Sequence, residues 1–419
     1  MTGTITDDDA EYALDIVKKI CAEVGPGLPG TSQERQRAEV IKNELETHLG
    51  TGNVAVEEFI FAPDAFLSTY PGGFCMLLAV LLNISTGHFT GISPWVTSIA
   101  AVVFAILSPL MFILEFLLSL EVFDPLFPKK KSLNVIGSLR KPEAGDVKRL
   151  LILSGHHDSA PENTWLRYTG VGFYILSAIY IIGLITLLVM CITQLAGLIL
   201  GNQAIVDFGT IGWVLLVFPI VPAIIYVLFL NRRGKNGGIV PGAADNLSAC
   251  AVAVAMCRFL ANNPAYIPDN TEIRFISFGS EEAGLRGSRR YVERHLDELK
   301  RLDARVLNYE VVAYPVISIL TSDVNGTVKN SPEMVKSVVS AAERAGVPFK
   351  MGAATIGAGG DSAPFSRVGL KALSLLSFKI PQQQFAFYHQ DRDTPEVLSI
   401  EPLLNVLKLT LEWIRNAGG

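Results

Sequence analysis

The chain has 419 residues, of which 50% are hydrophobic and only 18% are charged, and its mean hydropathy is positive at +0.37. An ordinary soluble domain carries about 25% charged residues, so this composition excludes a disordered chain and a wholly soluble protein. The net charge of −5 at pH 7 gives no reason to expect a nucleic-acid partner.

The N-terminal segment predicts two helices followed by a strand. Residues 8–23 have helical periodicity with acidic side chains in the first turn, where they stabilise the helix dipole. Thr31-Ser-Gln-Glu34 is a capping-box pattern and predicts a second helix to about residue 48. Residues 54–61 alternate like a strand. No basic segment followed by an apolar core stands at the N-terminus, so we expect no signal peptide.

The shortage of charge lies in two stretches of the chain. Residues 65–122 and 169–230 together hold only three charged side chains, Glu115, Glu121 and Asp207, whereas the rest has ordinary charge content. This distribution excludes a transporter-like bundle that is apolar throughout. It indicates one soluble domain interrupted by two apolar insertions. The predicted parts are 1–64, 65–122, 123–168, 169–230 and 231–419.

Each insertion contains two apolar runs that are long enough to cross a bilayer, since about 20 helical residues span its core of about 30 Å. Long buried core helices are the alternative, but the 31 uncharged residues from Gly170 to Leu200 exceed what a globular core requires. An even number of spans in each insertion would leave all the polar segments on one side of the membrane. The four predicted spans are 66–87, 92–118, 170–200 and 208–230.

Basic residues mark the side on which the polar segments lie. Lys129 to Lys131 follow the second run, and Arg232, Arg233 and Lys235 follow the fourth. The opposite loops, 85–93 and 201–207, contain no Lys or Arg. By the positive-inside rule, we predict an integral membrane protein with its polar domain in the cytoplasm.

The polar segments after the first insertion alternate between strands and helices. This order predicts an α/β domain with a three-layer, mixed and mostly parallel sheet that helices cover on both faces. Ligands of such domains bind at the carboxyl ends of the strands. The predicted strands are 133–139, 149–155, 272–278, 305–312 and 372–378, and the predicted helices are 244–260, 284–300, 331–345 and 400–416.

Clusters of His and carboxylate side chains lie at the predicted strand ends. Adjacent carboxylates after an apolar strand are costly unless a cation neutralises them, and zinc accepts His and carboxylate ligands. The number of candidate ligands fits two metals that share one carboxylate. The five cysteines form no CxxC pair, so we expect reduced thiols. The clusters are His156-His157-Asp158, Asp245-Asn246, Glu281-Glu282, Asn308-Tyr309-Glu310, and Tyr388-His389 with Asp391 and Asp393.

These motifs, in this order, resemble those of metallopeptidase family 28, the di-zinc exopeptidases that include aminopeptidase Y and bacterial leucyl aminopeptidases. Five motifs in order over about 240 residues are far more specific than any one of them. The resemblance implies a sheet of the zinc-exopeptidase type, with the insertions as transmembrane hairpins, and a zinc aminopeptidase that hydrolyses N-terminal peptide bonds. The matching segments are Gly155-His-His-Asp-Ser159, Ala244-Asp-Asn-Leu-Ser-Ala249, Glu281-Glu-Ala-Gly-Leu-Arg-Gly-Ser288, Leu307-Asn-Tyr-Glu310, and Tyr388-His389 with Asp393-Thr394.

The resemblance also implies which residues hold the metal. Asp245 would bridge two zinc ions, with other divalent metals as alternatives. His156 and Glu310 would complete one site, and Glu282 and His389 would complete the other. The expected partners are therefore a peptide substrate and the lipid bilayer.

Further roles follow from the same resemblance. Glu281 corresponds to the general base, which takes a proton from the attacking water and hands it to the leaving amine. Tyr388 is a candidate donor to the oxyanion. Asp158 would orient the imidazole of His156, whereas His157 points the other way and is expected to pack or to contact solvent.

The chain departs from the family pattern in three places. Glu310 stands where the family usually has Asp. The second insertion separates Asp158 from Asp245, which predicts a metal site beside the membrane. Two extra residues lie between His389 and Asp393. The glycine loop Gly357–Ser362 lacks the lysine of a phosphate loop. The resemblance implies that this loop lines the substrate pocket.

Two alternatives stay open at this stage. Carboxypeptidase or glutaminyl-cyclase chemistry could use the same metal site, since Glu310 could alter recognition of the substrate amine. A metal-free membrane receptor or scaffold could keep the peptidase fold.

Overall fold

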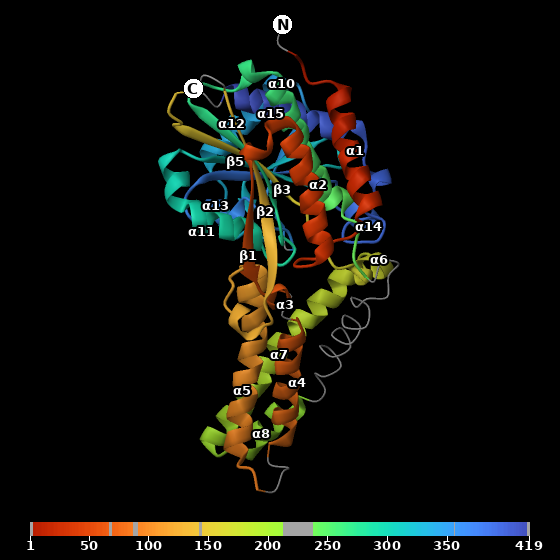
Figure 1. The fold of residues 1–419 in the computed structure, drawn as a ribbon. Helices are drawn as coiled ribbons and strands as arrows, with labels where there is room; N and C mark the ends of the chain where they lie inside the picture. Colours follow the sequence, from red (N-terminus) through yellow and green to blue (C-terminus); the bar gives the residue numbers. More distant parts are fainter. Residues whose placement is uncertain are drawn as a thin grey trace. The chain divides into compact units, whose positions relative to one another are not determined.

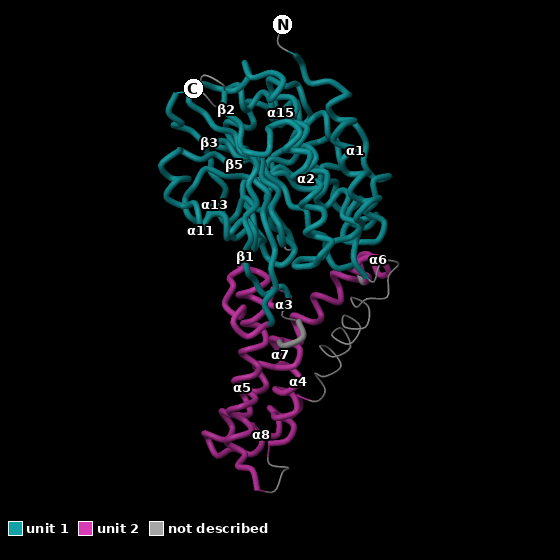
Figure 2. The backbone as a smooth tube through the Cα atoms, viewed as in Figure 1, with its two compact units in different colours: residues 1–63, 128–162, 234–419 teal, residues 64–127, 163–233 magenta. Residues whose placement is uncertain are grey.

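The computed structural model of the chain describes residues 3–66, 69–86, 91–141, 145–212, 238–355 and 357–416. The chain forms two compact units, and each unit is assembled from segments that are separated in the sequence (Figure 2). The first unit comprises residues 1–63, 128–162 and 234–419, and the second comprises residues 64–127 and 163–233.

An eight-stranded mixed sheet forms the centre of the first unit (Figure 1). β3 pairs in parallel with β4 and β5, β5 with β10, and β6 with β9, whereas β1–β2, β2–β4 and β10–β6 are antiparallel pairs. The prediction of a mixed, mostly parallel sheet is therefore confirmed. In spatial order the strands are β1 (Val54–Phe61), β2 (Lys130–Arg140), β4 (Thr271–Phe278), β3 (Arg149–His156), β5 (Arg305–Glu310), β10 (Lys371–Leu376), β6 (Ile317–Leu320) and β9 (Phe349–Gly352).

Helices cover both faces of this sheet. Successive strand residues point to opposite sides, so the apolar strands present a hydrophobic surface on each face. Leu151 and Leu153 of β3 belong to one apolar core, and Leu150 and Ile152 belong to the other. The larger core packs under α1 (Asp7–Glu23), α2 (Ser32–Leu49), α10 (Ser248–Asn262), α12 (Pro332–Ala345) and α15 (Ile400–Asn416). The smaller core packs under α11 (Arg286–Arg301) and α13 (Ala363–Arg367).

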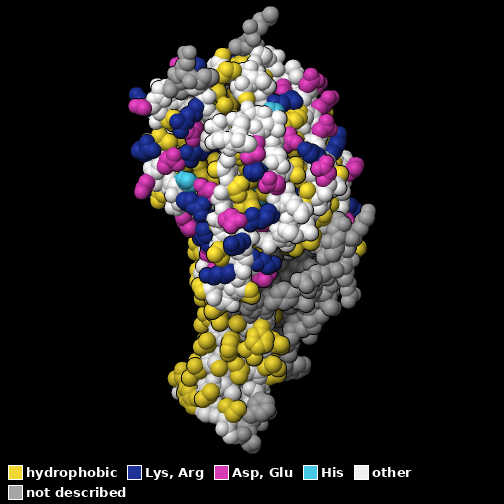
Figure 3. Space-filling model, viewed as in Figure 1, with side chains coloured by type: hydrophobic (Ala, Val, Ile, Leu, Met, Phe, Trp, Pro, Cys, Tyr) yellow, Lys and Arg dark blue, Asp and Glu magenta, His cyan; other side chains and the backbone are white. Residues whose placement is uncertain are grey.

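The second unit consists of apolar helices. Small side chains such as Ala79, Ala101 and Ala105 lie inside it, whereas large apolar side chains such as Val96 and Ile182 are exposed. Figure 3 shows hydrophobic side chains gathered over this unit. Small residues at helix contacts with large apolar residues outside are typical of helices that lie in lipid. The main helices are α4 (Thr69–Ser85), α5 (Pro94–Met111), α7 (Gly172–Leu200) and α8 (Gln203–Gly209), and a π-helical turn, Phe112–Leu117, extends α5.

Among the described residues, three helices are long and apolar enough to cross a membrane: Pro94–Leu117, Gly172–Leu200 and Ala243–Asn262. In the third, 94% of the most apolar window is buried, against 28% and 22% in the other two. Ala243–Asn262 contains α10, which packs on the sheet, so it is a core helix of the first unit. Length and composition leave the other two as candidate spans.

The first and fourth predicted spans are less well defined. Within the predicted span 66–87, the apolar helix Gly72–Ser85 is shorter than a full span. Most of the predicted span 208–230 lies outside the described residues. Helix α8 begins at Gln203, within the segment predicted as a loop, and ends at Gly209, two residues into this predicted span. Four spans and a cytoplasmic polar domain therefore stay a prediction.

Candidate metal centre

The parallel strands β3, β4 and β5 bring three polar segments to one edge of the sheet. His156 is the last residue of β3 and lies opposite Phe278, the last residue of β4. Glu281 and Glu282 follow β4 after a short turn, and Glu310 ends β5 on the other side of β3. Sheet register alone thus gathers side chains that are more than 150 positions apart in the sequence.

Asp245 enters the same edge from a turn that leads into α10. Its backbone is not helical, although the turn Ala243–Leu247 continues directly into that helix. The carboxylate of Asp393 holds this turn, since it accepts hydrogen bonds from the backbone N–H groups of Ala244 (2.7 Å) and Asp245 (3.1 Å). The C-terminal motif therefore positions Asp245 as well as contributing His389.

Among the described residues, the predicted ligands and the predicted base Glu281 form three groups whose candidate ligand atoms lie within 4.8 Å of one another. Nε2 of His156 lies 3.4 Å from one carboxylate oxygen of Asp245 and 3.8 Å from Glu310. Nε2 of His389 lies 3.1 Å from the other oxygen of Asp245 and 3.3 Å from Glu282. Asp245 therefore stands between two His-containing sets. The groups are His156–Asp245–Glu310, Asp245–Glu282–His389 and His156–Glu281–Glu282.

Part of the chain is similar in sequence to known peptidases. Residues 232–414 match the model of peptidase family M28. Aminopeptidase YwaD of Bacillus subtilis (strain 168) is 34% identical over 180 residues, which cover 42% of this chain and 38% of that protein. Residues 232–414 are therefore similar to peptidase family M28. The matched region spans less than two fifths of the length of that curated relative.

Several solved structures have a fold similar to that of this chain. A zinc aminopeptidase from Bacillus subtilis gives a TM-score of 0.55 at 15% identity, over 99% of this chain and 96% of that one. An aminopeptidase from Aneurinibacillus sp. strain AM-1 gives 0.54 at 14% identity, over 98% and 95% of the two chains. A glutaminyl cyclase from an Acidobacteriales bacterium gives 0.53 at 14% identity, over 100% and 98%. The predicted zinc-exopeptidase fold is confirmed.

The His and carboxylate side chains gathered at this site fit a divalent metal. Burial raises the pKa values of Glu281 and Glu310 well above the ordinary range, so the gathered carboxylates need a compensating cation. Burial alone would lower the pKa of His389, but the Glu282 and Asp245 carboxylates raise it to about 10. Nδ1 of His156 lies 3.4 Å from Asp158 and Oε1 of Glu282 lies 3.3 Å from Nε2 of His389, and neither contact has the geometry of a hydrogen bond. Carboxylates and imidazoles in this state suit zinc.

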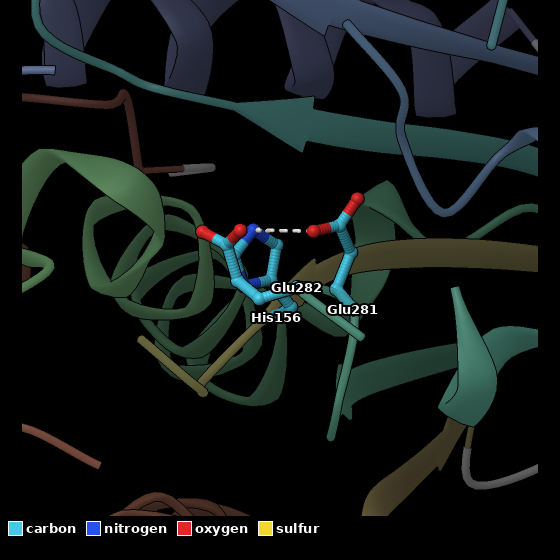
Figure 4. Close-up of side chains that lie close together, drawn as sticks. All are labelled: His156, Glu281 and Glu282. Atoms are coloured by element: carbon cyan, nitrogen blue, oxygen red, sulfur yellow. Dashed lines mark ion pairs between the residues drawn. The ribbon is translucent and has the colours of Figure 1, made fainter. Parts of the chain in front are cut away.

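Figure 4 shows how His156, Glu281 and Glu282 lie at this edge of the sheet. Oε2 of Glu281 is 3.6 Å from Nε2 of His156, on the ion pair drawn as a dashed line. Asp158 accepts hydrogen bonds from the backbone N–H groups of Glu281 (3.0 Å) and Glu282 (2.9 Å), and it lies 3.4 Å from Nδ1 of His156. Asp158 thus connects the end of β3 to the turn after β4.

The two remaining motif side chains differ in their surroundings. The ring of Tyr388 stacks on that of His389, with centroids 4.1 Å apart and an interplanar angle of 15°. His157 is fully buried, and its Nδ1 lies 2.8 Å from the Ser277 hydroxyl. His157 therefore packs in the interior and has no solvent contact.

Sequence reasoning missed the residues that support Glu310. Asn246 and Asn308 donate their Nδ2–H groups to the two oxygens of Glu310, at 2.8 and 2.7 Å. Both amides stand inside the motifs quoted above, and this position was the available signal. Gly360 approaches so closely that an added Cβ would lie 2.8 Å from Oε1 of Glu310. The next residue, Asp361, is fully buried, and burial raises its pKa to about 7.

Proposed function

We propose that this chain is a membrane-integral, zinc-dependent aminopeptidase that hydrolyses N-terminal peptide bonds with Glu281 as the general base. The main support is that Asp245 stands between two sets of ligands, each with one His and one Glu within 4.8 Å. The similarity of residues 232–414 to peptidase family M28 and the aminopeptidases that share the fold support the same reaction.

His156, Asp245 and Glu310 would hold one zinc ion, and Asp245, Glu282 and His389 would hold a second. A bound zinc ion acts as a Lewis acid that polarises a carbonyl and makes a water molecule a stronger acid. The buried carboxylates also favour the positively charged amine at the start of a peptide over a blocked terminus.

The side chains of this protein carry the proton transfers. Burial raises the pKa of Glu281, so its carboxylate takes up a proton readily from the attacking water and can pass it to the leaving amine. The hydroxyl of Tyr388, whose ring His389 holds by stacking, would donate a hydrogen bond to the oxyanion that forms as the carbonyl is attacked.

The membrane part of the proposal rests on the second unit. Pro94–Leu117 and Gly172–Leu200 are long, apolar and mostly unburied. The basic residues that flank the apolar runs favour a cytoplasmic first unit with four spans in two hairpins. Recovery of the protein only from detergent-extracted membranes would support this part separately from the chemistry.

Glutaminyl-cyclase chemistry is the second candidate. Two observations favour it: the fold of the Acidobacteriales glutaminyl cyclase covers the whole chain, and Glu310 departs from the usual Asp. A substrate panel separates the two reactions, because a cyclase acts on peptides that begin with Gln and releases ammonia, whereas an aminopeptidase releases the first residue.

The test is metal analysis and a peptide panel on detergent-purified protein. We expect about two zinc ions per chain and release of N-terminal residues from free but not blocked peptides. Glu281→Gln removes the proton acceptor, so kcat should fall by about 10²- to 10⁴-fold with zinc retained. Glu39→Gln is the matched control, since Glu39 is exposed on α2. Unchanged activity in Glu281→Gln would show that the general base is another group.

A further inference from the structure

Helix α2 places two ionisable side chains in the interior of the first unit. Glu34 is 1% exposed and Arg37 is 0% exposed, although neither belongs to the predicted metal centre. They are three residues apart and so share one face of the helix. Arg35 and Glu39 on the same helix are exposed. Burying a charge is costly unless hydrogen bonds compensate, so the contacts of these two side chains carry information.

Arg37 joins three separate backbone segments. Its guanidinium donates to the carbonyl oxygens of Gly25 (2.7 Å), His157 (3.2 Å) and Pro241 (2.5 Å). His157 follows the ligand His156 directly, and Pro241 lies four residues before Asp245. The planar guanidinium carries its donors on three separate nitrogen atoms, so it can reach three carbonyls that lie in different directions. Arg37 therefore fastens the end of β3 to the segment that carries Asp245.

Glu34 joins two further segments. One carboxylate oxygen accepts hydrogen bonds from the hydroxyls of Ser132 and Ser280, both at 2.8 Å, and the other accepts from the backbone N–H of Gly30 at 2.6 Å. Ser280 directly precedes Glu281, and its φ of +59° is in the left-handed region. Glu34 therefore fastens the turn after β4 to strand β2.

We propose that Arg37 and Glu34 are positioning residues that hold three of the five ligand-bearing segments in register, those of His156, Asp245 and Glu282. The metal part of this proposal rests on the proposed function. Zinc sites need ligand distances within about 0.2 Å of their ideal values, so displacement of a segment anchored only a few residues away would weaken binding. Neither side chain lies in the His–carboxylate groups of the metal centre, and their hydrogen bonds to the ligand-bearing segments go to backbone carbonyls and to the Ser280 hydroxyl.

The principal test compares Arg37→Lys with Arg35→Lys in the full-length protein. Lysine keeps the charge, but its three N–H groups lie on one nitrogen atom and cannot reach all three carbonyls. Arg35 is exposed on the same helix and pairs with Glu58. We expect zinc affinity, measured by competition with a chelator, to fall by about 10- to 100-fold in Arg37→Lys. Amide hydrogen exchange should accelerate in residues 156–160 and 239–247 but not in α12. Arg35→Lys should match the wild type.

The second variant, Glu34→Gln, tests the other segment and carries the proposal if Arg37→Lys does not fold. Its amide cannot accept from all three donors, so exchange should accelerate in residues 278–284 and zinc affinity should fall, while Glu39→Gln stays like the wild type. Wild-type exchange and zinc affinity in a folded variant would overturn the proposal. Failure of the wild type to bind zinc or release N-terminal residues would instead contradict the proposed function. Hydrogen exchange would still test the positioning roles, because it reports on the backbone of these segments without bound metal.

Discussion

Glu310 illustrates how single residues are tuned at this site. Its side chain is one methylene longer than the Asp usual in the family, and the amides of Asn246 and Asn308 each hold one of its oxygens. A longer side chain has more conformations to lose, and two hydrogen bonds restrict it to one of them. The departure from the family pattern is therefore accommodated by neighbours that are already present in the motifs.

Glu310→Asp tests this arrangement. The shorter side chain cannot reach both amides and also face His156, so we expect zinc affinity to fall by about 10-fold. Isothermal titration with zinc measures the effect. Glu333→Asp is the control, because the Glu333 side chain on α12 is exposed. If Glu310→Asp binds zinc as tightly as the wild type, the length of this side chain is not what the two amides select.

At the scale of secondary structure elements, β4 and α11 are joined by a bidentate ion pair. Arg274 donates to both oxygens of Glu298, at 2.7 and 2.9 Å. Because of this hydrogen-bonded partner, the pKa of Glu298 is lowered from its usual range. A carboxylate with a lowered pKa in the folded state adds stability above its unfolded pKa, and that stability is lost as the pH falls through the folded value.

Glu298→Gln should therefore destabilise the protein in a pH-dependent way. At pH 7 we expect a loss of about 1 kcal/mol in the free energy of unfolding. The difference from the wild type should shrink as the pH falls below about 4.5, where the unfolded carboxyl is protonated. Urea unfolding of the two proteins at pH 7 and pH 3.5 measures this. A difference that is constant with pH would show that the ion pair does not cause it.

Element prediction was accurate where periodicity is strong. The predicted strand at residues 54–61 is β1, and the helices predicted at 8–23 and 331–345 are α1 and α12 within one residue. The four-residue strands β6 and β9 were not predicted, because such short runs show no period and pair only with distant segments.

The capping box at the start of α2 had a more complex outcome. Thr31 accepts a hydrogen bond from the Glu34 N–H, as predicted. The Glu34 carboxylate, however, bonds to Gly30, Ser132 and Ser280 and not to the N-cap N–H. Local spacing identified the helix start, but it could not identify partners that lie about 100 and 250 positions away.

At the scale of the whole molecule, folding gathers several buried carboxylates at one edge of the sheet. Burial raises the pKa of Glu281 and Glu310 well above the usual range. A bound cation should therefore stabilise the folded state of the first unit. Ligand binding at about 100 times its Kd adds about 2.7 kcal/mol of stability.

Metal removal tests this coupling. Dialysis against a chelator should lower the Tm of the wild type by several degrees, and added zinc should restore it. His389→Ala removes one ligand, so the shift caused by the chelator should be smaller in this variant. Scanning calorimetry in detergent measures both. An identical Tm with and without zinc would show that folding and metal binding are independent.

The sequence by itself determined the two apolar insertions, the order of the M28 motifs and most strand and helix positions. These features are local, because each depends on periodicity, composition or short spacing. Hydropathy alone does not distinguish Ala243–Asn262 from a span, but the alternation of strands and helices already predicted a helix of the α/β domain there, and its packing on the sheet confirms this. The tertiary structure decided which carboxylates meet at Asp245 and which residues of α2 hold their segments. Burial and hydrogen-bond partners depend on contacts between distant parts of the chain, which no local pattern encodes.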